Sequence, residues 1–232
     1  MSKYAIGLDY GTLSVRALVV DVRDGKEVCS SVYEYRHQVM DERLPSGKKL
    51  PTQWALQDPS DYVEGLIQTV NEVLKYIDKD DVIGIGIDFT SSTILPVKSD
   101  TTPLCQIEKF KDEPHAYVKL WKHHGANEQA LIMDEIIKQR NEEWISLYGG
   151  TVSSEWMFPK IYETLHFAPE VYNEADYFIE ALDWITWKLT GEQSRSMCGS
   201  GYKAFYHYKN KYPSKDFFKA LEPRLENVVE EK

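Results

Sequence analysis

Short runs of hydrophobic residues fill the first 35 positions of the chain and predict β-strands. The runs at 4–9, 13–21 and 27–35 are separated only by turn residues at 10–12 and at 24–25. Connections this short join antiparallel neighbours, because parallel strands need a crossover of a dozen or more residues. We therefore expect an antiparallel three-stranded meander at the start of the chain.

An exposed connection and then a helix are predicted next. Residues 38–57 contain two prolines, a glycine and few apolar positions, which indicates an excursion over the surface. The sequence DPSD at 58–61 supplies an N-cap residue, a proline at the first helical position and an early acidic residue. The pattern that follows predicts a helix over 58–79 whose buried face carries Val63, Leu66, Ile67, Val70, Leu74 and Ile77.

The run VIGIGID at 82–88 is almost continuously apolar, as in a parallel strand that is buried on both faces. A helical crossover from the third strand would place this run parallel to the first strand. The run TILPV at 93–97 is its expected partner. Together these elements predict a mixed five-stranded sheet packed by the helix at 58–79.

Beyond residue 114 the pattern becomes mainly helical. Helical spacing predicts helices over 116–123, 127–139 and 154–167. Residues 177–181 read as a short strand, and the following run predicts a helix over 181–189 that ends at Gly191. Two tryptophans on that last helix, at helical spacing, favour core packing over a stacking platform: Trp184 and Trp187.

Composition is typical of an ordinary globular protein without nucleic-acid partners. The 232 residues include 42% hydrophobic residues and carry a formal net charge of -10. Basic residues alternate with acidic ones instead of clustering, which excludes a nucleic-acid scaffold. Cys29, Cys105 and Cys198 are odd in number and widely spaced, so we expect reduced, structural thiols. Without a signal peptide or an apolar run of about 18 residues, a soluble cytoplasmic protein with no membrane partner is expected.

The segment DYGTLSVR at the end of the first strand carries candidate chemistry. Gly11 would let an anion approach the backbone N–H groups of a tight turn. Thr12 and Ser14 add hydroxyl donors, and Arg16 adds a cation on the same strand face. Asp9 could hold a hydrated Mg²⁺ ion against phosphate oxygens. These groups would position a transferring phosphoryl group; the alternative is a hairpin turn in which Asp and Gly serve turn geometry alone.

Competing nucleotide and metal motifs are absent from the sequence. It contains no GxxxxGK[ST], no GxGxxG after a strand, no HExxH and no GxSxG. On a helix, the adjacent His123 and His124 would point to different sides, which favours surface or hydrogen-bonding roles over a shared metal. A weak echo of the first motif, GIDFTSST at 86–93, hints that both strand ends face one cleft.

Several segments together resemble the FGGY carbohydrate kinases. DYGTLSVR is similar to the first phosphate motif of that family, whose turn faces the γ-phosphate of ATP. Five later blocks resemble the branch that phosphorylates L-ribulose and span nearly the whole chain: GIDFTSSTILPV, PHAYVKLWKHHGA, YGGTVSSEWMFPK, EALDWITWKLTG and RSMCGSGYKAFY. Xylulose and glycerol kinases typically carry Asp-x-Arg after the tryptophan near 121. This chain has Lys122, His123 and His124 there, which favours the L-ribulose branch.

This resemblance implies the fold and the reaction. The implied fold is an α/β, ribonuclease-H-like domain, as in actin and hexokinase, with a helical sugar-binding insertion. Residues 1–232 would be the amino-terminal, sugar-binding domain, inactive alone, because the family's catalytic base and nucleotide-binding motifs would lie beyond Lys232. The implied reaction converts L-ribulose to L-ribulose 5-phosphate with ATP and Mg²⁺, in arabinose catabolism. Asp9 and Asp88 match phosphate-facing and strand-terminal positions, so neither is expected to act as the base.

For the sugar, the positions that match the family are Ser91, Thr93 and Lys203. A lysine ammonium can donate to ketose oxygens as well as to phosphate. The alternatives are an exposed helix lysine at 203 and local backbone capping by the two hydroxyls. Trp121 would either wall the sugar pocket or fill the core.

Three functional hypotheses remain at this point. The first is the kinase of L-ribulose, and the second is a kinase of the same family for D-ribulose, ribitol or xylulose. The third is a non-catalytic ligand-binding half-domain of the actin-like fold. The resemblance also leaves a homodimer open.

Overall fold

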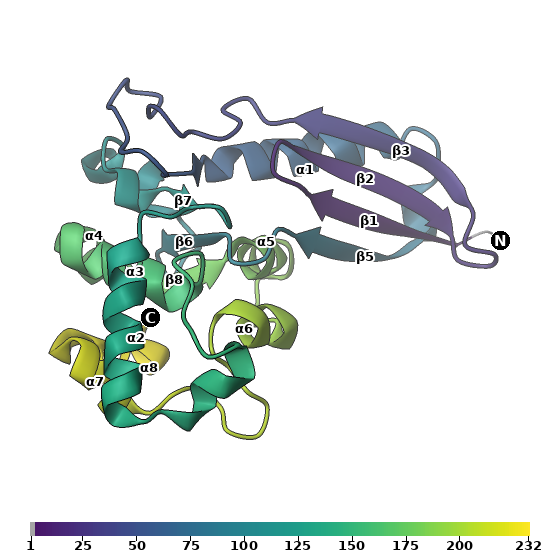
Figure 1. The fold of residues 1–232 in the computed structure, drawn as a ribbon. Helices are drawn as coiled ribbons and strands as arrows, with labels where there is room; N and C mark the ends of the chain where they lie inside the picture. Colours follow the sequence, from purple (N-terminus) through teal and green to yellow (C-terminus); the bar gives the residue numbers. More distant parts are fainter. Residues whose placement is uncertain (1–2) are drawn as a thin grey trace. The chain divides into compact units, whose positions relative to one another are not determined.

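The structure is a computed structural model that describes residues 3–232. The chain divides into two compact units (Figure 1). The first contains the chain up to Val39 together with Gln57–Thr90, and the second contains Met40–Leu56 and Ser91–Lys232. Each unit has buried hydrophobic residues of its own, and each is described by itself.

The first unit is built on a four-stranded mixed sheet in the order β3-β2-β1-β5. The antiparallel neighbours are β1 (Tyr4–Tyr10), β2 (Ser14–Asp21) and β3 (Glu27–Glu34), which confirms the predicted meander. The parallel pairing of β5 (Val82–Phe89) with β1 is also as predicted. Within residues 3–232 the predicted count of five strands is wrong, because the run at 93–97 belongs to a different sheet.

The helix α1 (Pro59–Val73) packs against β2 and β3 (Figure 1). Its N-cap is the predicted one, since a carboxylate oxygen of Asp58 accepts the Ser60 N–H at 2.9 Å. The buried face is not the predicted one and consists of Tyr62, Gly65, Thr69 and Val73. Gly65 accounts for the difference, because a Cβ there would collide with Val15 on the sheet. Glycine therefore lets this side of the helix approach the strands closely.

The burial predicted for β5 is also wrong. Ile83 is 63% exposed and Ile85 is 47% exposed, although the apolar run predicted a strand covered on both faces. The reason is topological: β5 is an edge strand of this sheet, and α1 packs mainly over β2 and β3. Periodicity reports the apolar character of a strand but not its place in the sheet order.

The second unit contains a sheet of four short strands in the order β4-β7-β6-β8. They are β4 (Leu56–Gln57), β7 (Val118–Lys119), β6 (Ile94–Val97) and β8 (Tyr177–Glu180). β6 runs antiparallel to both β7 and β8. The predicted strand at 177–181 is therefore confirmed, whereas the predicted pairing of 93–97 with 82–88 is wrong.

The predicted helix at 116–123 is absent. A 3₁₀ turn (Pro114–Ala116) leads into β7 instead. Residues 116–118 and Leu120 are all buried, and a short apolar run that is buried throughout carries no periodicity to separate a strand from a helix.

Helices supply most of the remaining structure of the second unit. They are α2 (Asn127–Arg140), α3 (Met157–Phe167), α4 (Pro169–Glu174), α5 (Ala181–Thr190), α6 (Met197–Lys203), α7 (Lys215–Leu221) and α8 (Val228–Glu231). The first two and α5 match predicted helices, and α5 ends at Gly191 with φ 75° as expected for a left-handed C-cap. Across residues 3–232, no helix combines the length and the apolar character of a membrane span.

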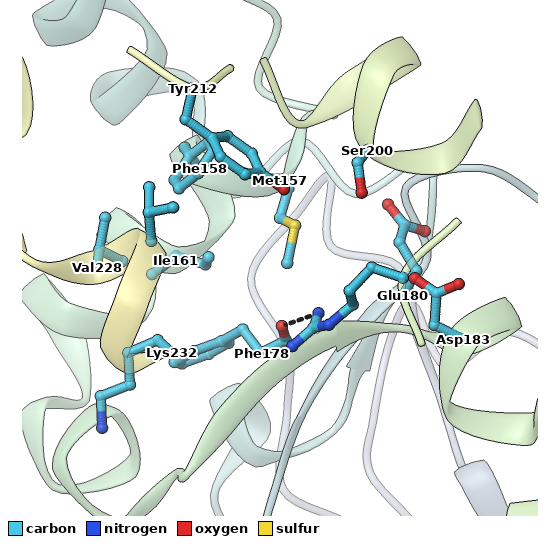
Figure 2. Close-up of a pocket in the computed structure, with 12 residues that line it drawn as sticks. Met157, Phe158, Ile161, Phe178, Glu180, Asp183, Ser200, Tyr212, Val228 and Lys232 are labelled. Carbon is cyan, nitrogen blue, oxygen red and sulfur yellow. Dashed lines mark hydrogen bonds between the residues drawn. The ribbon is translucent and has the colours of Figure 1, made fainter. Parts of the chain in front are cut away.

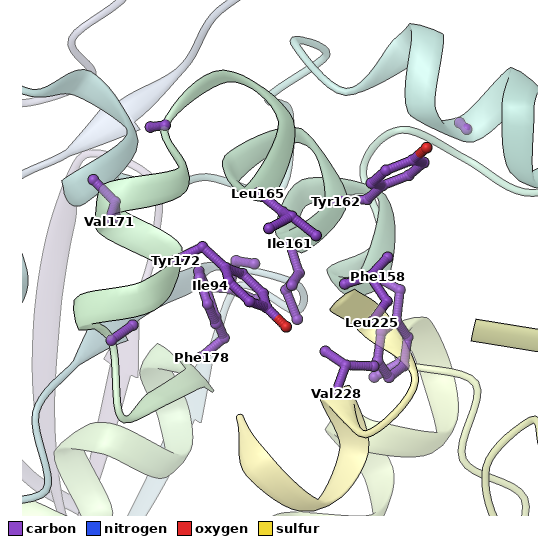
Figure 3. Packing of buried hydrophobic residues seen from close by; sticks show 14 of the residues in the cluster. Ile94, Phe158, Ile161, Tyr162, Leu165, Val171, Tyr172, Phe178, Leu225 and Val228 are labelled. Carbon is purple, nitrogen blue, oxygen red and sulfur yellow. The ribbon is translucent and has the colours of Figure 1, made fainter. Parts of the chain in front are cut away.

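The core of the second unit is gathered around α3 (Figure 3). Phe158, Ile161 and Leu165 of this helix belong to one buried cluster with Phe178 of β8 and Val228 of α8. The predicted core role of the two tryptophans is confirmed, because Trp184 and Trp187 of α5 are buried.

The segment predicted as an exposed excursion contributes to this core. Met40, Leu44 and Leu56 are buried members of the cluster, and Met40 exchanges backbone hydrogen bonds with Leu56 at 2.8 and 2.9 Å. The prolines and the glycine exclude regular structure over most of 38–57, but they do not prevent the few apolar residues from being buried.

Candidate functional site

The charged residues of the first motif gather on one face of the first unit's sheet. Asp9 of β1 lies opposite Arg16 of β2 and opposite Asp88 of β5. All three are exposed, while the alternate residues of β1 point to the buried face. Gly7 and Gly86 are also register partners, two residues before the aspartates. Because neither glycine has a side chain, a ligand can approach the sheet backbone beside the carboxylates.

The turn after β1 is held by hydrogen bonds of its own. The Gly11 N–H donates to the Ser14 carbonyl at 2.9 Å, which closes the turn. The Gln57 side-chain amide donates to the Thr12 carbonyl at 2.7 Å. Thr12 and Ser14 are half-buried at this turn. Their hydroxyls, together with Arg16, are the donors that the motif brings to one end of the sheet.

In the second unit, the bend that follows β5 centres on Ser92. Ser92 is fully buried, and its φ of 64° lies in the left-handed region that non-glycine residues rarely adopt. Its hydroxyl donates to the Glu155 carbonyl at 2.7 Å, and its own carbonyl accepts from the Lys160 ammonium at 2.6 Å. The backbone N–H groups of Ser92 and Thr93 hydrogen-bond to the Glu180 carboxyl. Four polar contacts therefore hold this bend.

The two predicted sugar-binding hydroxyls on this bend have different surroundings. Thr93 is fully buried, and its carbonyl accepts the Ala181 N–H at 2.8 Å. The Ser91 hydroxyl is shielded from solvent and has no hydrogen-bond partner among residues 3–232. Ser91 is thus the residue of this pair whose hydroxyl can turn to a ligand, whereas Thr93 anchors the bend through its backbone.

Lys203 lies at the end of α6 and is not the exposed helix lysine that composition alone suggested. Only 14% of its side chain is exposed, and its Nζ lies 3.6 Å from Oε2 of Glu155. Oε1 of Glu155 lies 3.7 Å from Nε2 of His124, and the Glu155 carbonyl accepts the Ser92 hydroxyl. Glu155 therefore brings the bend and the lysine together.

A buried charge network connects β7 with α3. The Lys119 ammonium donates to Glu163 at 2.6 Å and to Thr164 at 2.7 Å, and Nε2 of His123 lies 3.1 Å from Glu163. Burial alone would raise the pKa of Glu163, but Lys119 and His123 hold it well below its usual value. Burial lowers the pKa of His123 to about 4, so this ring is neutral at neutral pH.

The histidine pair therefore lies in a turn, not on the predicted helix. His123 has the hydrogen-bonding role that the sequence favoured over a shared metal, and its Nδ1 accepts the Ala55 N–H at 3.3 Å. Over the described part of the chain, no group of three or more His, Cys, Asp and Glu side chains is arranged to hold a metal ion.

A cavity of about 230 Å³ in the second unit is lined by Glu180, Asp183 and Ser200 at its polar end (Figure 2). Burial raises the pKa of both carboxyl groups, and one oxygen of each has no hydrogen-bond partner within residues 3–232. The other oxygen of Asp183 accepts the Ser196 N–H at 2.9 Å. This bond fixes the start of α6, the helix that ends at Lys203.

Sequence reasoning missed three residues that shape this site: Glu155, Lys160 and Glu180. A usable signal existed for Lys160, because it stands between apolar residues in a predicted core helix, and lysine is almost never buried without partners. Glu180 likewise ends a buried apolar strand. Nothing in the sequence distinguished Glu155 from an ordinary surface glutamate.

Comparisons with known proteins agree with this architecture. Residues 4–224 match the sequence profile described as "FGGY family of carbohydrate kinases, N-terminal domain". The chain is 48% identical over 231 residues to a ribulokinase of Halalkalibacterium halodurans, covering 98% of this chain and 41% of that protein. It is 50% identical over 223 residues to a ribulokinase of Bacillus licheniformis, covering 95% of this chain and 40% of that protein.

A solved structure supports the same fold at much lower sequence similarity. The gluconate kinase of Lactobacillus acidophilus superimposes with a TM-score of 0.71 at 17% identity, over 96% of this chain and 40% of that protein. The chain thus spans about two fifths of the length of the curated relatives that it matches. The profile match covers nearly all of residues 3–232. The chain therefore belongs to the FGGY family of carbohydrate kinases.

Proposed function

We propose that the complete protein carrying this chain transfers the γ-phosphate of ATP to L-ribulose, and that residues 1–232 supply its sugar-binding domain. The two relatives named above are ribulokinases at 48% and 50% identity. The segments whose resemblance favours the L-ribulose branch include Lys122 to His124 and Gly201 to Lys203.

The observation that carries the sugar assignment is the meeting of Ser92 and Lys203 at Glu155. The Glu155 backbone carbonyl accepts the Ser92 hydroxyl at 2.7 Å, and the Glu155 carboxylate lies 3.6 Å from the Lys203 ammonium. A half-buried ammonium beside a carboxylate offers a donor and an acceptor to neighbouring hydroxyls of a ketose. Ser91 adds a hydroxyl on the same bend. We therefore assign Lys203 and Ser91 to sugar binding, and we assign Thr93 to holding the bend that carries Ser91.

The phosphate side of the reaction is assigned to the first unit. Asp9, Asp88 and Arg16 are cross-strand neighbours on an exposed, glycine-lined face, and hydrated Mg²⁺ takes carboxylate oxygens as ligands or as second-sphere acceptors. These residues fit ATP phosphates with Mg²⁺, with Thr12 and Ser14 as hydroxyl donors. Bound there, the metal would neutralise charge on the transferring phosphoryl group.

We assign no general base within residues 1–232. Asp9 and Asp88 belong to the proposed phosphate and metal site, where a carboxylate must stay ionised. The base, the adenosine contacts and the inactivity of residues 1–232 alone remain predictions from the family resemblance.

The test is calorimetry and phosphotransfer on the complete protein with L-ribulose, D-ribulose, ribitol and D-xylulose. We expect L-ribulose to give the largest kcat/KM and to bind without ATP. Preferred turnover of another of these compounds would reassign the sugar within the family. Binding of a pentulose without any phosphotransfer would favour the non-catalytic hypothesis.

A further inference from the structure

Lys160 is a fully buried lysine whose side-chain amine hydrogen-bonds to two backbone carbonyls. Its Nζ donates to the Ser92 carbonyl at 2.6 Å and to the Leu120 carbonyl at 2.9 Å. Burying an ammonium costs several kcal/mol unless hydrogen bonds compensate it. A neutral, apolar residue would satisfy the α3 helix and its core equally well, so packing alone does not account for a lysine here.

The two carbonyls belong to the segments that carry the proposed sugar contacts. Ser92 lies between Ser91 and Thr93, and Leu120 is followed directly by Trp121, which is half-buried. The lysine therefore joins two segments that are 28 positions apart in the chain (120 minus 92) and fixes both to α3.

The conformation at Ser92 is one that requires such support. A non-glycine residue in the left-handed region costs about 1 kcal/mol or more and persists only when its surroundings enforce it. Three contacts enforce it here. The Lys160 side chain donates to the Ser92 carbonyl, the Ser92 hydroxyl donates to the Glu155 carbonyl, and the Ser92 N–H donates to the Glu180 carboxyl. Of these three contacts, the one from Lys160 also reaches a second segment, because the same Nζ donates to the Leu120 carbonyl.

We propose that Lys160 is a positioning residue for sugar binding: it holds the bend at Ser92 and the segment at Leu120 in the geometry in which Ser91, Lys203 and Trp121 meet the ketose. This inference rests on the proposed function. Lys160 itself does not touch the sugar, because its Nζ is enclosed by the two carbonyls and its side chain has no exposed surface.

A purely structural role is the competing explanation, and the chain contains a matched control for it. Lys119 is also buried, and it donates three hydrogen bonds, to Glu163, Thr164 and the Lys160 carbonyl. None of these bonds reaches the bend at Ser92. Lys119→Met and Lys160→Met therefore each remove one buried lysine side chain from the same unit, but only the second removes a contact with the bend.

The experiment compares these two variants in the complete protein by calorimetry with L-ribulose and by hydrogen exchange of the backbone at residues 90–95. For Lys160→Met we expect a loss of affinity of about ten- to a hundredfold, and exchange at 90–95 faster by about tenfold or more. For Lys119→Met we expect less than about a threefold change in either measurement, although both variants lose stability. If Lys160→Met does not fold, Lys160→Gln retains N–H donors in the same space and should show both effects in weaker form.

Three outcomes decide the inference. Wild-type affinity in a folded Lys160 variant would overturn it, and so would equal losses in the Lys119 and Lys160 variants. If the wild-type protein does not bind L-ribulose, the proposed function is wrong. In that case the exchange comparison still decides whether Lys160 holds the bend: faster exchange confined to the Lys160 variant supports the contact, and equal exchange in both variants overturns it.

Discussion

The two units of this chain differ in the partners that their buried carboxylates have. In the first unit, each buried aspartate has a partner that reaches solvent: Asp21 pairs with Arg23, and Asp61 pairs with His37. The second unit also has exposed ion pairs, but in the pair of Lys119 with Glu163 both partners are buried. The candidate phosphate residues of the first unit accordingly lie on an exposed face, whereas the candidate sugar residues of the second are supported from inside.

This difference reflects how each site obtains its geometry. On the first unit's sheet, backbone register alone sets Asp9 opposite Arg16 and Asp88, and no side-chain scaffold is needed. The second unit has only short strands, so irregular bends must be held by side chains that satisfy backbone groups in the interior. We therefore expect substitutions of buried charge to affect the second unit far more than substitutions of charge affect the first.

The largest expected effect is that of Glu163→Ala on stability. Removal of this carboxylate leaves the Lys119 ammonium buried without its counter-charge. It also removes the hydrogen-bond partner of the His123 ring. Breaking a buried pair on one side costs about 3–5 kcal/mol. Urea unfolding of the complete protein measures this loss.

Glu64→Ala is the matched change in the first unit. Its partner Arg36 is 67% exposed, so the expected change is about 0.5 kcal/mol or less. Equal losses in the free energy of unfolding for the two glutamate substitutions would mean that burial of the ion pair in the second unit does not affect stability.

Lys203→Ala is expected to act on the sugar and not on the fold. Loss of a charge-assisted hydrogen bond to the substrate should raise the KM for L-ribulose by about ten- to a hundredfold. Arg16→Ala, in the first unit, should instead raise the KM for ATP. The prediction is checked by steady-state kinetics with each substrate varied in turn.

The control for Lys203 is Lys209→Ala. Lys209 lies 5.4 Å from the ring of its neighbour Tyr208, much as Lys203 lies 5.6 Å from that of Tyr202, but Lys209 is exposed. We expect wild-type kinetics for it. Wild-type KM and kcat for Lys203→Ala with L-ribulose would remove this lysine from the site.

Local patterns in the sequence were enough for the first unit's topology. The short turns required antiparallel neighbours, and the helical crossover required the parallel pairing of 82–88. Which residues are buried was harder to predict, because burial depends on residues that are far away in the chain. The apolar side of α1 was misplaced since Gly65 carries no apolar signal, and the run at 82–88 gave no indication that it would be an edge strand.

In the second unit, the candidate site was found only in part. Lys203 and Ser91 came from the family resemblance, which matches residues but not their supports. Lys160 and Glu180 bind backbone groups of the bend at Ser92, and the Glu155 backbone carbonyl accepts the Ser92 hydroxyl. A backbone carbonyl has the same chemistry at every position, so no sequence pattern indicates which of them a buried lysine will hold.

A smaller effect, visible only on acidification, is expected at His115. Burial and the nearby Lys119 charge lower the pKa of His115 from 6.5 to about 2 in the folded protein. The unfolded chain therefore binds the proton first, so folded stability is lost as pH falls below about 6.5. His115→Phe keeps a ring against Trp54 and Phe167 but removes the titration.

The comparison is made by unfolding wild-type and His115→Phe proteins at pH 7.5 and pH 5.5. Relative to wild type, the variant should gain about 1.4 kcal/mol at the lower pH. A stability difference that does not change with pH would show that His115 is accessible to protons in the folded state.

The smallest expected effect is that of a substitution at Ile67, which tests the burial of α1 in the first unit. Ile67 lies on the face that periodicity predicted to be buried, but it is 52% exposed, whereas Val73 on the glycine-containing face is fully buried. In the 232-residue chain, Ile67→Ser should change the free energy of unfolding by about 0.5 kcal/mol or less, while Val73→Ala should cost about 2 kcal/mol. Urea unfolding measures both. A loss at Ile67 as large as the loss at Val73 would mean that the apolar face is covered after all, in which case helical periodicity was the better guide to this helix than the close approach at Gly65.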